Sequence, residues 1–284
     1  MSEKNKVEKS TLYLVATPIG NLSDISERAI KVLSEVDFIA AEDTRNSMRL
    51  LSALGIKNEL VSYHEHNKKS SGERLVARLL SGESCALITD AGMPAISDPG
   101  EDIVKLCADA GIVVSVIPGA CAAVSALSVS GLGTRRFAFE GFLSANKGER
   151  KKQLLALARE ERTMIFYEAP HKLRATLSDM AEAFGEERKI AICRELTKIN
   201  EEIVRITIGE AAALYLTKEP RGEFVLVVEG ASPKKETDES SSSALTPREQ
   251  VEALIASGTD KKDAIKEVAK RLGVHKSEIY ALML

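Results

Sequence analysis

The stretch TLYLVATPIGN, Thr11 to Asn21, joins an apolar run to a turn that contains both proline and glycine. The run TLYLVA predicts a buried β-strand, because it is short and almost wholly apolar. Glycine allows a backbone to approach a ligand closely, and open α/β sheets bind ligands beyond the carboxyl ends of their strands. We therefore interpret Thr17 to Asn21 as a ligand-approach turn; the alternative is a turn that only reverses the chain.

The pattern that starts here repeats along the first half of the chain. Strand-like runs alternate with helical ones, and the strand-like runs are TLYLVAT, DFIAAE, ELVSYH, CALITD and VVSVIP. Such alternation predicts a mostly parallel sheet with helices on both faces. The pattern restarts around GFLSANKGER, and only one short helix separates three later strand candidates, KIAICREL, EEIVRITI and EFVLVVEG. We predict an α/β protein with two α/β domains, the second built on a mixed sheet.

Changes in composition place the boundaries. We expect a disordered N-terminus over residues 1–10, a first α/β domain over 11–142 and a second over 143–230. The serine-rich polar stretch that follows predicts a flexible linker over 231–246. Three short amphipathic helices over 247–284 indicate a small C-terminal helical module that is helix-turn-helix-like, or else a plain packing unit.

Overall composition narrows the function. The chain has 284 residues, 44% of them hydrophobic, and a formal net charge of −3, which argues against a surface that binds nucleic acid everywhere. No apolar run reaches the ~20 residues that cross a bilayer, so we expect a cytoplasmic protein without a membrane anchor. The four cysteines are widely spaced and form no CxxC pair, which favours buried reduced thiols over a disulfide framework or zinc site.

One segment is locally basic. Arg135 and Arg136 precede the run SANKGERKK, which contributes Lys147, Arg150, Lys151 and Lys152. A polyanion such as RNA would need a local patch of this kind. The segment is equally well explained as a solvated loop followed by a first helical turn.

Several common catalytic motifs are absent: the sequence contains no GxxxxGK[ST], no GxGxxG after the first strand, no HExxH and no GxSxG. His64 and His66 in YHEHN would share one face if they lay on a strand, which suits a metal ion. Because no third ligand can be identified, we predict no metal site.

Five specialised turns follow the five predicted strands of the first domain. They are Thr17 to Asn21, Glu42 to Arg45, His64 to Asn67, Thr89 to Gly100 and Ile117 to Ala123. In a parallel sheet these turns converge on one cleft. Gly92, Ala95, Gly119 and Ala120 leave room for close backbone approach, and the loops DAGMPAISDPG and PGACAA contain no lysine or arginine to neutralise a polyphosphate. A cationic or neutral ligand is expected, with Asp90 bonding ribose hydroxyls or an amino group and Ile19, Met93 and Ile117 forming apolar walls.

The motifs LYLVATPIGNLSDIS, AAEDTR, YHEHN, LITDAGMPAISDPG, VIPGACAAVSALSVSG, FYEAPHKL, RELTK and GEFVLVVEG together resemble the tetrapyrrole methylase family of S-adenosylmethionine enzymes. The resemblance covers about Leu12 to Gly230 and is strongest to the branch that methylates a cytidine 2′-hydroxyl in small-subunit (16S) ribosomal RNA. It implies a cofactor cleft between two α/β domains, S-adenosyl-L-methionine as cofactor, and a homodimer. The strict Gly-x-Gly-Pro-Gly of corrin-type members is TPIGN here, which argues against a tetrapyrrole substrate.

The resemblance also implies which residues bind the cofactor. The first loop contributes Pro18, Ile19 and Gly20, and the fourth loop contributes Asp90, Gly92 and Met93, with Ala95 behind them. The fifth loop contributes Pro118, Gly119, Ala120, Cys121 and Ala122. Tyr167 and Glu168 fall on the second-domain strand whose end touches the cofactor.

Methyl transfer to a ribose hydroxyl needs alignment and a base within hydrogen-bond reach. The candidate bases at predicted strand ends are Glu42, Asp43, His64, His66 and Glu168. Arg45 would hold a phosphate, and Arg194, Glu195 and Lys198 of RELTK would complete the wall on the RNA side. Alternatives remain: Asp43 as a helix cap, the histidines as ordinary strand residues, and Glu168 as an orienting group for the Pro170 helix start.

Three functions compete at this point. The first is 2′-O-methylation of a cytidine ribose in small ribosomal subunit RNA. The second is methylation of a small molecule of the tetrapyrrole kind. The third is a non-catalytic RNA-binding assembly factor that uses the C-terminal module.

Overall fold

The computed structural model describes residues 6–232 and 246–283 of the chain. Residues 1–5 of the expected N-terminal tail and 233–245 of the expected linker lie outside the described residues. Residues 6–10 differ from the expected disorder, because the Ser10 amide donates to the Glu83 carbonyl (3.0 Å) and Lys9 Nζ lies 3.2 Å from Asp37 Oδ1. The described residues divide into two compact units, one up to Ala231 and one from Ser232.

The first sheet is wholly parallel, as predicted. Its order is β3-β2-β4-β1-β5, formed by β1 (Thr11–Val15), β2 (Phe38–Ala41), β3 (Leu60–Ser62), β4 (Cys85–Ile88) and β5 (Val113–Ile117). The linking helices are α1 (Glu27–Glu35), α2 (Thr44–Ala53), α3 (Lys68–Leu80) and α4 (Gly100–Asp109), with a short 3-10 turn over Leu22–Asp24. Because all five strands are parallel, their carboxyl ends meet at one edge.

Helices cover both faces of this sheet because side chains alternate along each strand. On β1, Tyr13 packs in a core with residues of α1 and α2, whereas Leu12 packs in a second core with residues of α3 and α4. The strands are therefore apolar on both sides, which explains their continuous hydrophobic runs.

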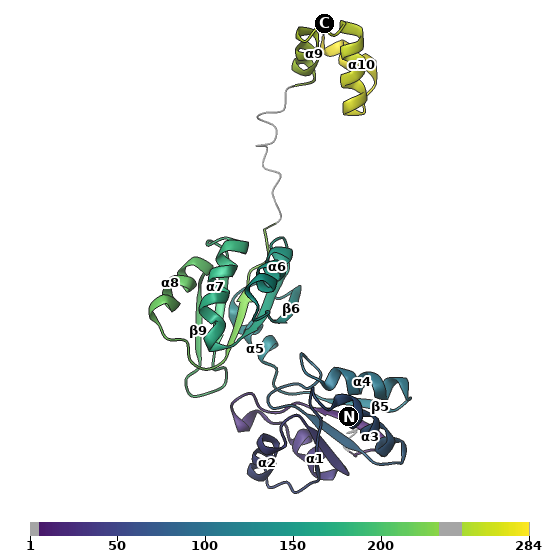
Figure 1. Cartoon of the computed structure of the whole chain (residues 1–284), viewed down its shortest axis with the longest axis vertical. Helices are drawn as coiled ribbons and strands as arrows, with labels where there is room; N and C mark the ends of the chain where they lie inside the picture. Colours follow the sequence, from purple (N-terminus) through teal and green to yellow (C-terminus); the bar gives the residue numbers. More distant parts are fainter. Residues whose placement is uncertain (1–5, 233–245, 284) are drawn as a thin grey trace. The chain divides into compact units, whose positions relative to one another are not determined.

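The second sheet is mixed, also as predicted, with the order β6-β7-β10-β8-β9. Its strands are β6 (Phe137–Phe142), β7 (Thr163–Glu168), β8 (Lys189–Arg194), β9 (Glu202–Thr207) and β10 (Phe224–Val228). Only β6 and β7 pair in parallel; the other three pairs are antiparallel. One face is covered by α6 (Lys147–Leu157), α7 (Pro170–Phe184) and α8 (Ile208–Thr217) (Figure 1).

The expected domain boundary after residue 142 does not match where the sheets divide. The first sheet ends with β5 at Ile117, and β6 belongs to the second sheet. The helix α5 (Ala122–Ser130) packs on the other face of the second sheet, where Ala126 and Leu127 share a core with Ile165 and Val225. The division therefore falls between β5 and α5, because α5 buries its apolar face against the second sheet and not the first.

The C-terminal unit contains the three predicted helices, α9 (Pro247–Ala256), α10 (Lys261–Leu272) and α11 (Lys276–Leu282). Val251, Ile265, Val268 and Ile279 form its small core. Gly273 ends α10 with a left-handed φ of 68° that favours glycine. A helix-turn-helix function for the unit stays a prediction.

Candidate active site

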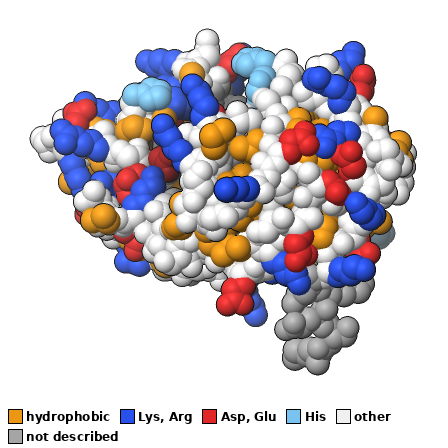
Figure 2. Space-filling model, turned by 90° about the horizontal axis from the view of Figure 1, so that it is seen from below, with side chains coloured by type: hydrophobic (Ala, Val, Ile, Leu, Met, Phe, Trp, Pro, Cys, Tyr) orange, Lys and Arg blue, Asp and Glu red, His pale blue; other side chains and the backbone are white. Residues whose placement is uncertain are grey.

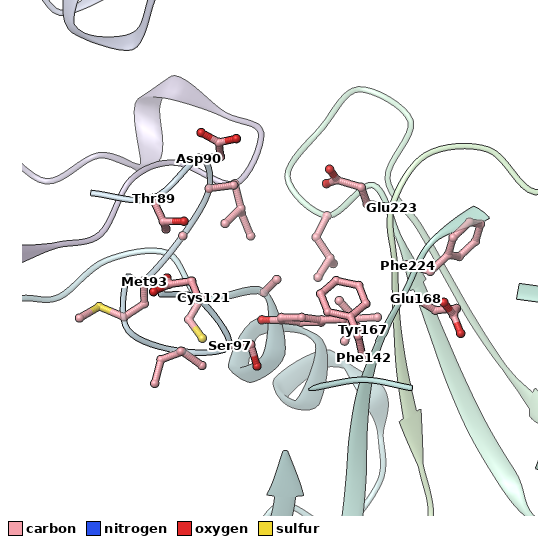
Figure 3. Close-up of a pocket in the computed structure, with 18 of the residues that line it drawn as sticks. Thr89, Asp90, Met93, Ser97, Cys121, Phe142, Tyr167, Glu168, Glu223 and Phe224 are labelled. Carbon is pink, nitrogen blue, oxygen red and sulfur yellow. The ribbon is translucent and has the colours of Figure 1, made fainter. Parts of the chain in front are cut away.

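A cavity of about 460 Å³ lies where the loops at the carboxyl edge of the first sheet face the second sheet (Figure 3). The first-sheet side contributes Ile19, Glu42, Thr89 to Met93, Ile96 to Asp98, Cys121 and Ala122. The second-sheet side contributes Phe142, Tyr167 to Pro170, Cys193, Leu196 and Glu223 to Val225. This volume falls in the range of small-molecule and cofactor pockets, ~300–1,000 Å³.

The loop after β4 is held in an unusual backbone conformation. Ala95 and Ser97 have φ values of 66° and 61°, which residues with a Cβ rarely adopt. The Asp98 carboxylate holds the loop by accepting hydrogen bonds from the Ala95 amide (2.9 Å) and the Gly100 amide (2.7 Å). Burial raises the pKa of Asp98, against the effect of these amides. Such strain, retained beside a cavity, is typical of a functional site.

The loop after β5 brings a helix start to the same cavity. A Cβ at Gly119 would lie 2.9 Å from Ala16 Cβ, so glycine permits the close approach of the first and fifth loops. The helix α5 begins directly afterwards, and no side chain caps its first turn. Instead, the Ala123 amide donates to the Tyr167 hydroxyl (3.2 Å), which ties this helix to β7.

The opposite wall is aromatic. The Tyr167 ring lies 5.0 Å from the Phe139 ring and 5.5 Å from the Phe142 ring, measured between centroids. Figure 3 shows the Tyr167 hydroxyl reaching toward Cys121. Burial raises the pKa of Tyr167 to about 12, so its phenol is neutral near pH 7.

The charged side chains that line the cavity are all acidic. Among the residues that line the cavity, Glu42, Asp90, Asp98, Glu168 and Glu223 carry carboxyl groups, and none is lysine or arginine. The expectation of a cationic or neutral ligand stays a prediction. A ligand with a positive charge is favoured here over an anionic one.

Two of the five predicted bases, Glu42 and Glu168, line the cavity. Within the described residues, only the Glu42 carboxylate of these two is free of an ion pair. Glu42 Oε2 accepts a hydrogen bond from the Thr89 hydroxyl (2.9 Å), and both residues line the cavity. Glu168 is 3% exposed, and its carboxylate bonds the Ala169 amide (2.9 Å), the Thr176 hydroxyl and Lys172 Nζ (3.2 Å). Because successive strand residues point to opposite faces, Glu168 turns toward α7 while Tyr167 faces the cavity. Glu168 therefore orients the start of α7.

The other three predicted bases do not line the cavity. Asp43 is the N-cap of α2 and accepts from the Arg45 amide (2.9 Å), and its hydrogen bonds with the Arg45 guanidinium hold its pKa near 2. A carboxylate with so low a pKa is a poor proton acceptor at neutral pH. The capping alternative is thus supported for Asp43.

The histidines lie after β3 and not on it, as expected for the turn His64 to Asn67, and the alternative of ordinary strand residues is not supported. The strand ends at Ser62, and His64 and His66 follow in the connection to α3, with their ring centroids 5.9 Å apart. Within residues 6–232 and 246–283, no group of three or more His, Cys, Asp or Glu side chains is arranged to hold a metal ion.

The predicted cofactor residues fall into two groups. Those that line the cavity are Ile19, Asp90, Gly92, Met93, Cys121, Ala122 and Tyr167. Those that do not are Pro18, Gly20, Ala95, Pro118, Gly119 and Ala120. Gly20 instead lines a second cavity of about 490 Å³, together with Asn21, Leu22 and Thr197 to Asn200, so the TPIGN and RELTK segments lie side by side.

Some lining residues have no predicted role: Thr89 and Ile96 lie in the predicted turn Thr89 to Gly100, whereas Phe142 and Glu223 lie in none of the predicted turns. Thr89 is signalled by its place at the end of an apolar strand run, as Asp90 is. Phe142 and Glu223 have no such signal, because their positions depend on the pairing of the second sheet.

The predicted RNA contacts need one correction. Arg150 is only 5% exposed and forms a buried ion pair, with its guanidinium 2.7 Å from Asp179 Oδ2. It points into the domain because it lies on the face of α6 that packs against α7. Arg150 therefore cannot belong to a basic surface patch.

The remaining predicted contacts are at the surface or partly paired. Arg135, Arg136, Lys147 and Arg45 are exposed, and Arg45 pairs with Asp43 (2.9 Å). Arg194 pairs with Glu202 (2.9 Å), and Lys198 pairs with both Glu195 (2.9 Å) and Glu223 (3.0 Å). The face in Figure 2 shows basic and acidic side chains interspersed. No helix in the described parts of the chain is long and apolar enough to cross a membrane.

Comparison with known proteins adds a family. A family model described as Tetrapyrrole (Corrin/Porphyrin) Methylases matches residues 11–212. Ribosomal RNA small subunit methyltransferase I of Halalkalibacterium halodurans is 50% identical over 279 residues, which cover 98% of this chain and 96% of that protein. The protein of the same name from Bacillus subtilis is 50% identical over 282 residues, covering 99% and 96%.

A solved structure shares the fold. The crystal structure of uroporphyrin-III C-methyl transferase from Thermus thermophilus, complexed with S-adenyl homocysteine, matches with a TM-score of 0.53. It is 19% identical and covers 76% of this chain and 96% of that chain. At this identity the match supports the fold alone.

Proposed function

We propose that this chain, which belongs to the tetrapyrrole methylase family, methylates ribosomal RNA. The reaction is S-adenosylmethionine-dependent 2′-O-methylation of a cytidine ribose in small-subunit (16S) ribosomal RNA. The observation that carries the proposal is the identity of 50% over nearly the whole length of relatives named ribosomal RNA small subunit methyltransferase I. The TPIGN turn in place of the Gly-x-Gly-Pro-Gly of corrin-type members supports RNA over a tetrapyrrole as substrate.

The lining of the 460 Å³ cavity suits S-adenosyl-L-methionine. When bound, this cofactor supplies a methyl group on a positively charged sulfur, and the carboxylates of the cavity favour that charge. Asp90 would bond the ribose hydroxyls or the amino group. Ile19, Met93 and Ala122 would flank the apolar parts of the cofactor, and the Gly92 backbone would lie against it.

The chain's own residues then have two tasks, alignment and proton removal. In the transfer, the bond from sulfur to the methyl carbon breaks as the ribose oxygen bonds to that carbon, and the hydroxyl proton must leave. Glu42 is the lining carboxylate placed to accept it, because Asp43 is used in capping and Glu168 in orienting α7. The Thr89 hydroxyl, which donates to Glu42 Oε2, would hold the carboxylate in position.

RNA would approach from the mouth of this cavity. The exposed Arg45, Arg135, Arg136 and Lys147 are candidates for phosphate contacts, as are Arg194 and Lys198, of which Lys198 lies near the TPIGN turn. Homodimer formation and a cytoplasmic location belong to the same proposal, the first from the family resemblance and the second because ribosomal RNA is the substrate named for the relatives.

The test is incubation of the purified chain with methyl-labelled S-adenosylmethionine and, in parallel, small ribosomal subunits, naked 16S RNA or uroporphyrinogen. We expect label in 16S RNA at one cytidine, where the methylated ribose resists alkaline cleavage. Label in uroporphyrinogen would support the small-molecule alternative. Label in none of the three would support the non-catalytic assembly factor.

A further inference from the structure

Phe142 is an aromatic side chain that the chemistry described so far does not use. It lines the cavity although its side chain is part of no buried core, and it is 57% exposed (Figure 3). Single exposed apolar residues are common on protein surfaces and need no explanation by themselves. Phe142 differs because three features of the chain fix its position: a β-bulge and two contacts of its ring.

The first is a β-bulge in β6. The pairing with β7 runs from Phe139 opposite Ile165 directly to Gly141 opposite Phe166, so Glu140 is an extra residue. Gly141 has a φ of 64°, a conformation that favours glycine. Phe142 is three residues after Phe139, so a strand without the bulge would put their side chains on opposite faces of the sheet; the bulge puts Phe142 opposite Tyr167, on the cavity face.

The second and third features are contacts of the ring itself, with Tyr167 and with Lys172. Tyr167 is the pairing partner of Phe142 on β7, and its ring packs against the Phe142 ring at 5.5 Å. Lys172 Nζ lies 5.6 Å from the centroid of the Phe142 ring, donates to the Leu143 carbonyl (3.3 Å) and is 3.2 Å from Glu168 Oε1. The positive charge of Lys172 is therefore balanced by Glu168, and the ring rests on a strand and a helix, not on a flexible loop.

What remains is a fixed aromatic surface at the cavity, on the wall opposite the loops proposed to hold the cofactor. Aromatic rings of this kind stack with the bases of single-stranded RNA, because every base has a π-face. The apolar Ile96, 47% exposed, lines the same cavity and would limit the space beside a stacked base.

Resting on the function proposed above, we propose that Phe142 is the platform against which the base of the acceptor nucleotide stacks, so that its ribose hydroxyl is presented to the cofactor. Phe142 is thus a substrate-positioning residue. It takes no part in proton transfer or in cofactor binding.

The experiment compares four full-length variants with the wild-type chain. Phe142→Ala removes the ring, Phe142→Leu keeps an apolar side chain without a π-face, and Phe142→Trp keeps a stacking surface. Phe137→Ala is the matched control, because Phe137 lies on the same strand and is 41% exposed but does not line the cavity. For each chain, kcat and KM are measured with small ribosomal subunits, and S-adenosylhomocysteine affinity is measured by calorimetry.

Loss of one stacked base corresponds to a fall of about 5- to 150-fold in kcat/KM for Phe142→Ala. We expect a similar fall for Phe142→Leu, retained activity for Phe142→Trp and Phe137→Ala, and S-adenosylhomocysteine affinity within about twofold of wild type throughout. Wild-type activity reports on the proposed function separately. With an active wild type, full activity of Phe142→Ala or Phe142→Leu, or a parallel loss of S-adenosylhomocysteine affinity, would overturn the stacking role.

A second comparison identifies the base. An RNA of the segment that the wild-type chain methylates is prepared with either cytidine or an abasic ribose at the target position. The Phe142→Ala defect in binding should be large with cytidine and should disappear with the abasic RNA. An equal defect with both RNAs would contradict stacking of the acceptor base.

Discussion

Thr17 and Gly92 form an isolated antiparallel bridge in which each amide donates to the carbonyl of the other, at 2.9 and 3.1 Å. The bridge joins the turn after β1 to the loop after β4, and both segments contribute residues to the cavity lining. Gly92 has a φ of 85°, and a Cβ there would lie 3.2 Å from Ile19 Cγ2. The glycine is needed both for its conformation and for the closeness of Ile19.

Gly92→Ala should therefore reduce stability by about 1–2 kcal/mol, the cost of a left-handed conformation for a residue with a Cβ, and weaken S-adenosylhomocysteine binding several-fold. Gly55→Ala is the control, since Gly55 has a φ of 69° with no atom near its Cβ position. Urea unfolding and calorimetry separate the two effects. A variant at Gly92 that loses stability but binds the cofactor product normally would show that the bridge does not shape the site.

Asp90→Ala should lower S-adenosylhomocysteine affinity by about 10- to 150-fold, the loss of a hydrogen bond with a charged acceptor. Asp90 lines the cavity, and its carboxylate accepts a hydrogen bond from the Asn46 side-chain amide (3.3 Å). Arg45→Ala should leave this affinity unchanged and weaken binding of RNA. Unaltered calorimetric affinity in the Asp90 variant would remove this residue from the cofactor site.

Glu42→Gln should lower kcat about 100-fold or more while S-adenosylhomocysteine affinity stays unchanged, because a positioned base contributes about 10²–10⁴ to rate. The comparison is Asp43→Asn, in which kcat should change far less, since Asp43 does not line the cavity. Single-turnover methylation of small ribosomal subunits measures the chemical step. If Asp43→Asn were the slower enzyme, Glu42 would not be the base.

Arg150→Ala should reduce the free energy of unfolding by about 3–5 kcal/mol, because it leaves the buried Asp179 carboxylate without its partner. Lys147→Ala, on the exposed start of the same helix, should change stability by no more than about 0.5 kcal/mol. Chemical denaturation measures both. Replacing Arg150 with Met and Asp179 with Leu together should recover much of the loss, and failure to do so would mean that other contacts of Arg150 dominate.

The raised pKa of Tyr167 predicts how stability changes at alkaline pH. Its pKa is raised to about 12 by burial, whereas an unfolded tyrosine ionises near pH 10. The folded state favours the neutral phenol, so its contribution to stability is complete below about pH 10 and is lost as the pH rises toward 12. Absorbance titration of phenolate should show a late-titrating tyrosine that is missing in Tyr167→Phe. Tyr63, also raised to about 12, should remain in that variant.

Much of the fold follows from local pattern. The alternation of apolar strands and amphipathic helices predicts the parallel sheet, and a parallel sheet brings all its carboxyl-end loops to one edge. That is why the sequence alone predicts Ile19, Asp90, Met93 and Cys121 as neighbours, and all four line the cavity. The lack of lysine and arginine in two of these loops likewise predicts the sign of the charge in the cavity.

The sequence predictions differ from the structure where a residue packs against, or pairs with, a residue that is distant in the chain. Arg150 reads as part of a basic run, but its place on the buried face of α6 pairs it with Asp179 of α7. The helix α5 continues the βα pattern of the first domain, yet its small apolar residues pack on the second sheet. Glu168 is a candidate base by its place at a strand end, and only the packing of β7 against α7 engages its carboxylate with Thr176 and Lys172.

Local sequence patterns predict the order of the elements, the parallel and mixed character of the two sheets and the loops around the cavity, because these depend on side-chain periodicity and on glycine and proline at short range. The carboxylates that face the cavity, the division between the two domains and the position of Phe142 follow only from the folded chain. These depend on one extra residue in β6 and on pairings between distant segments, which no local pattern encodes.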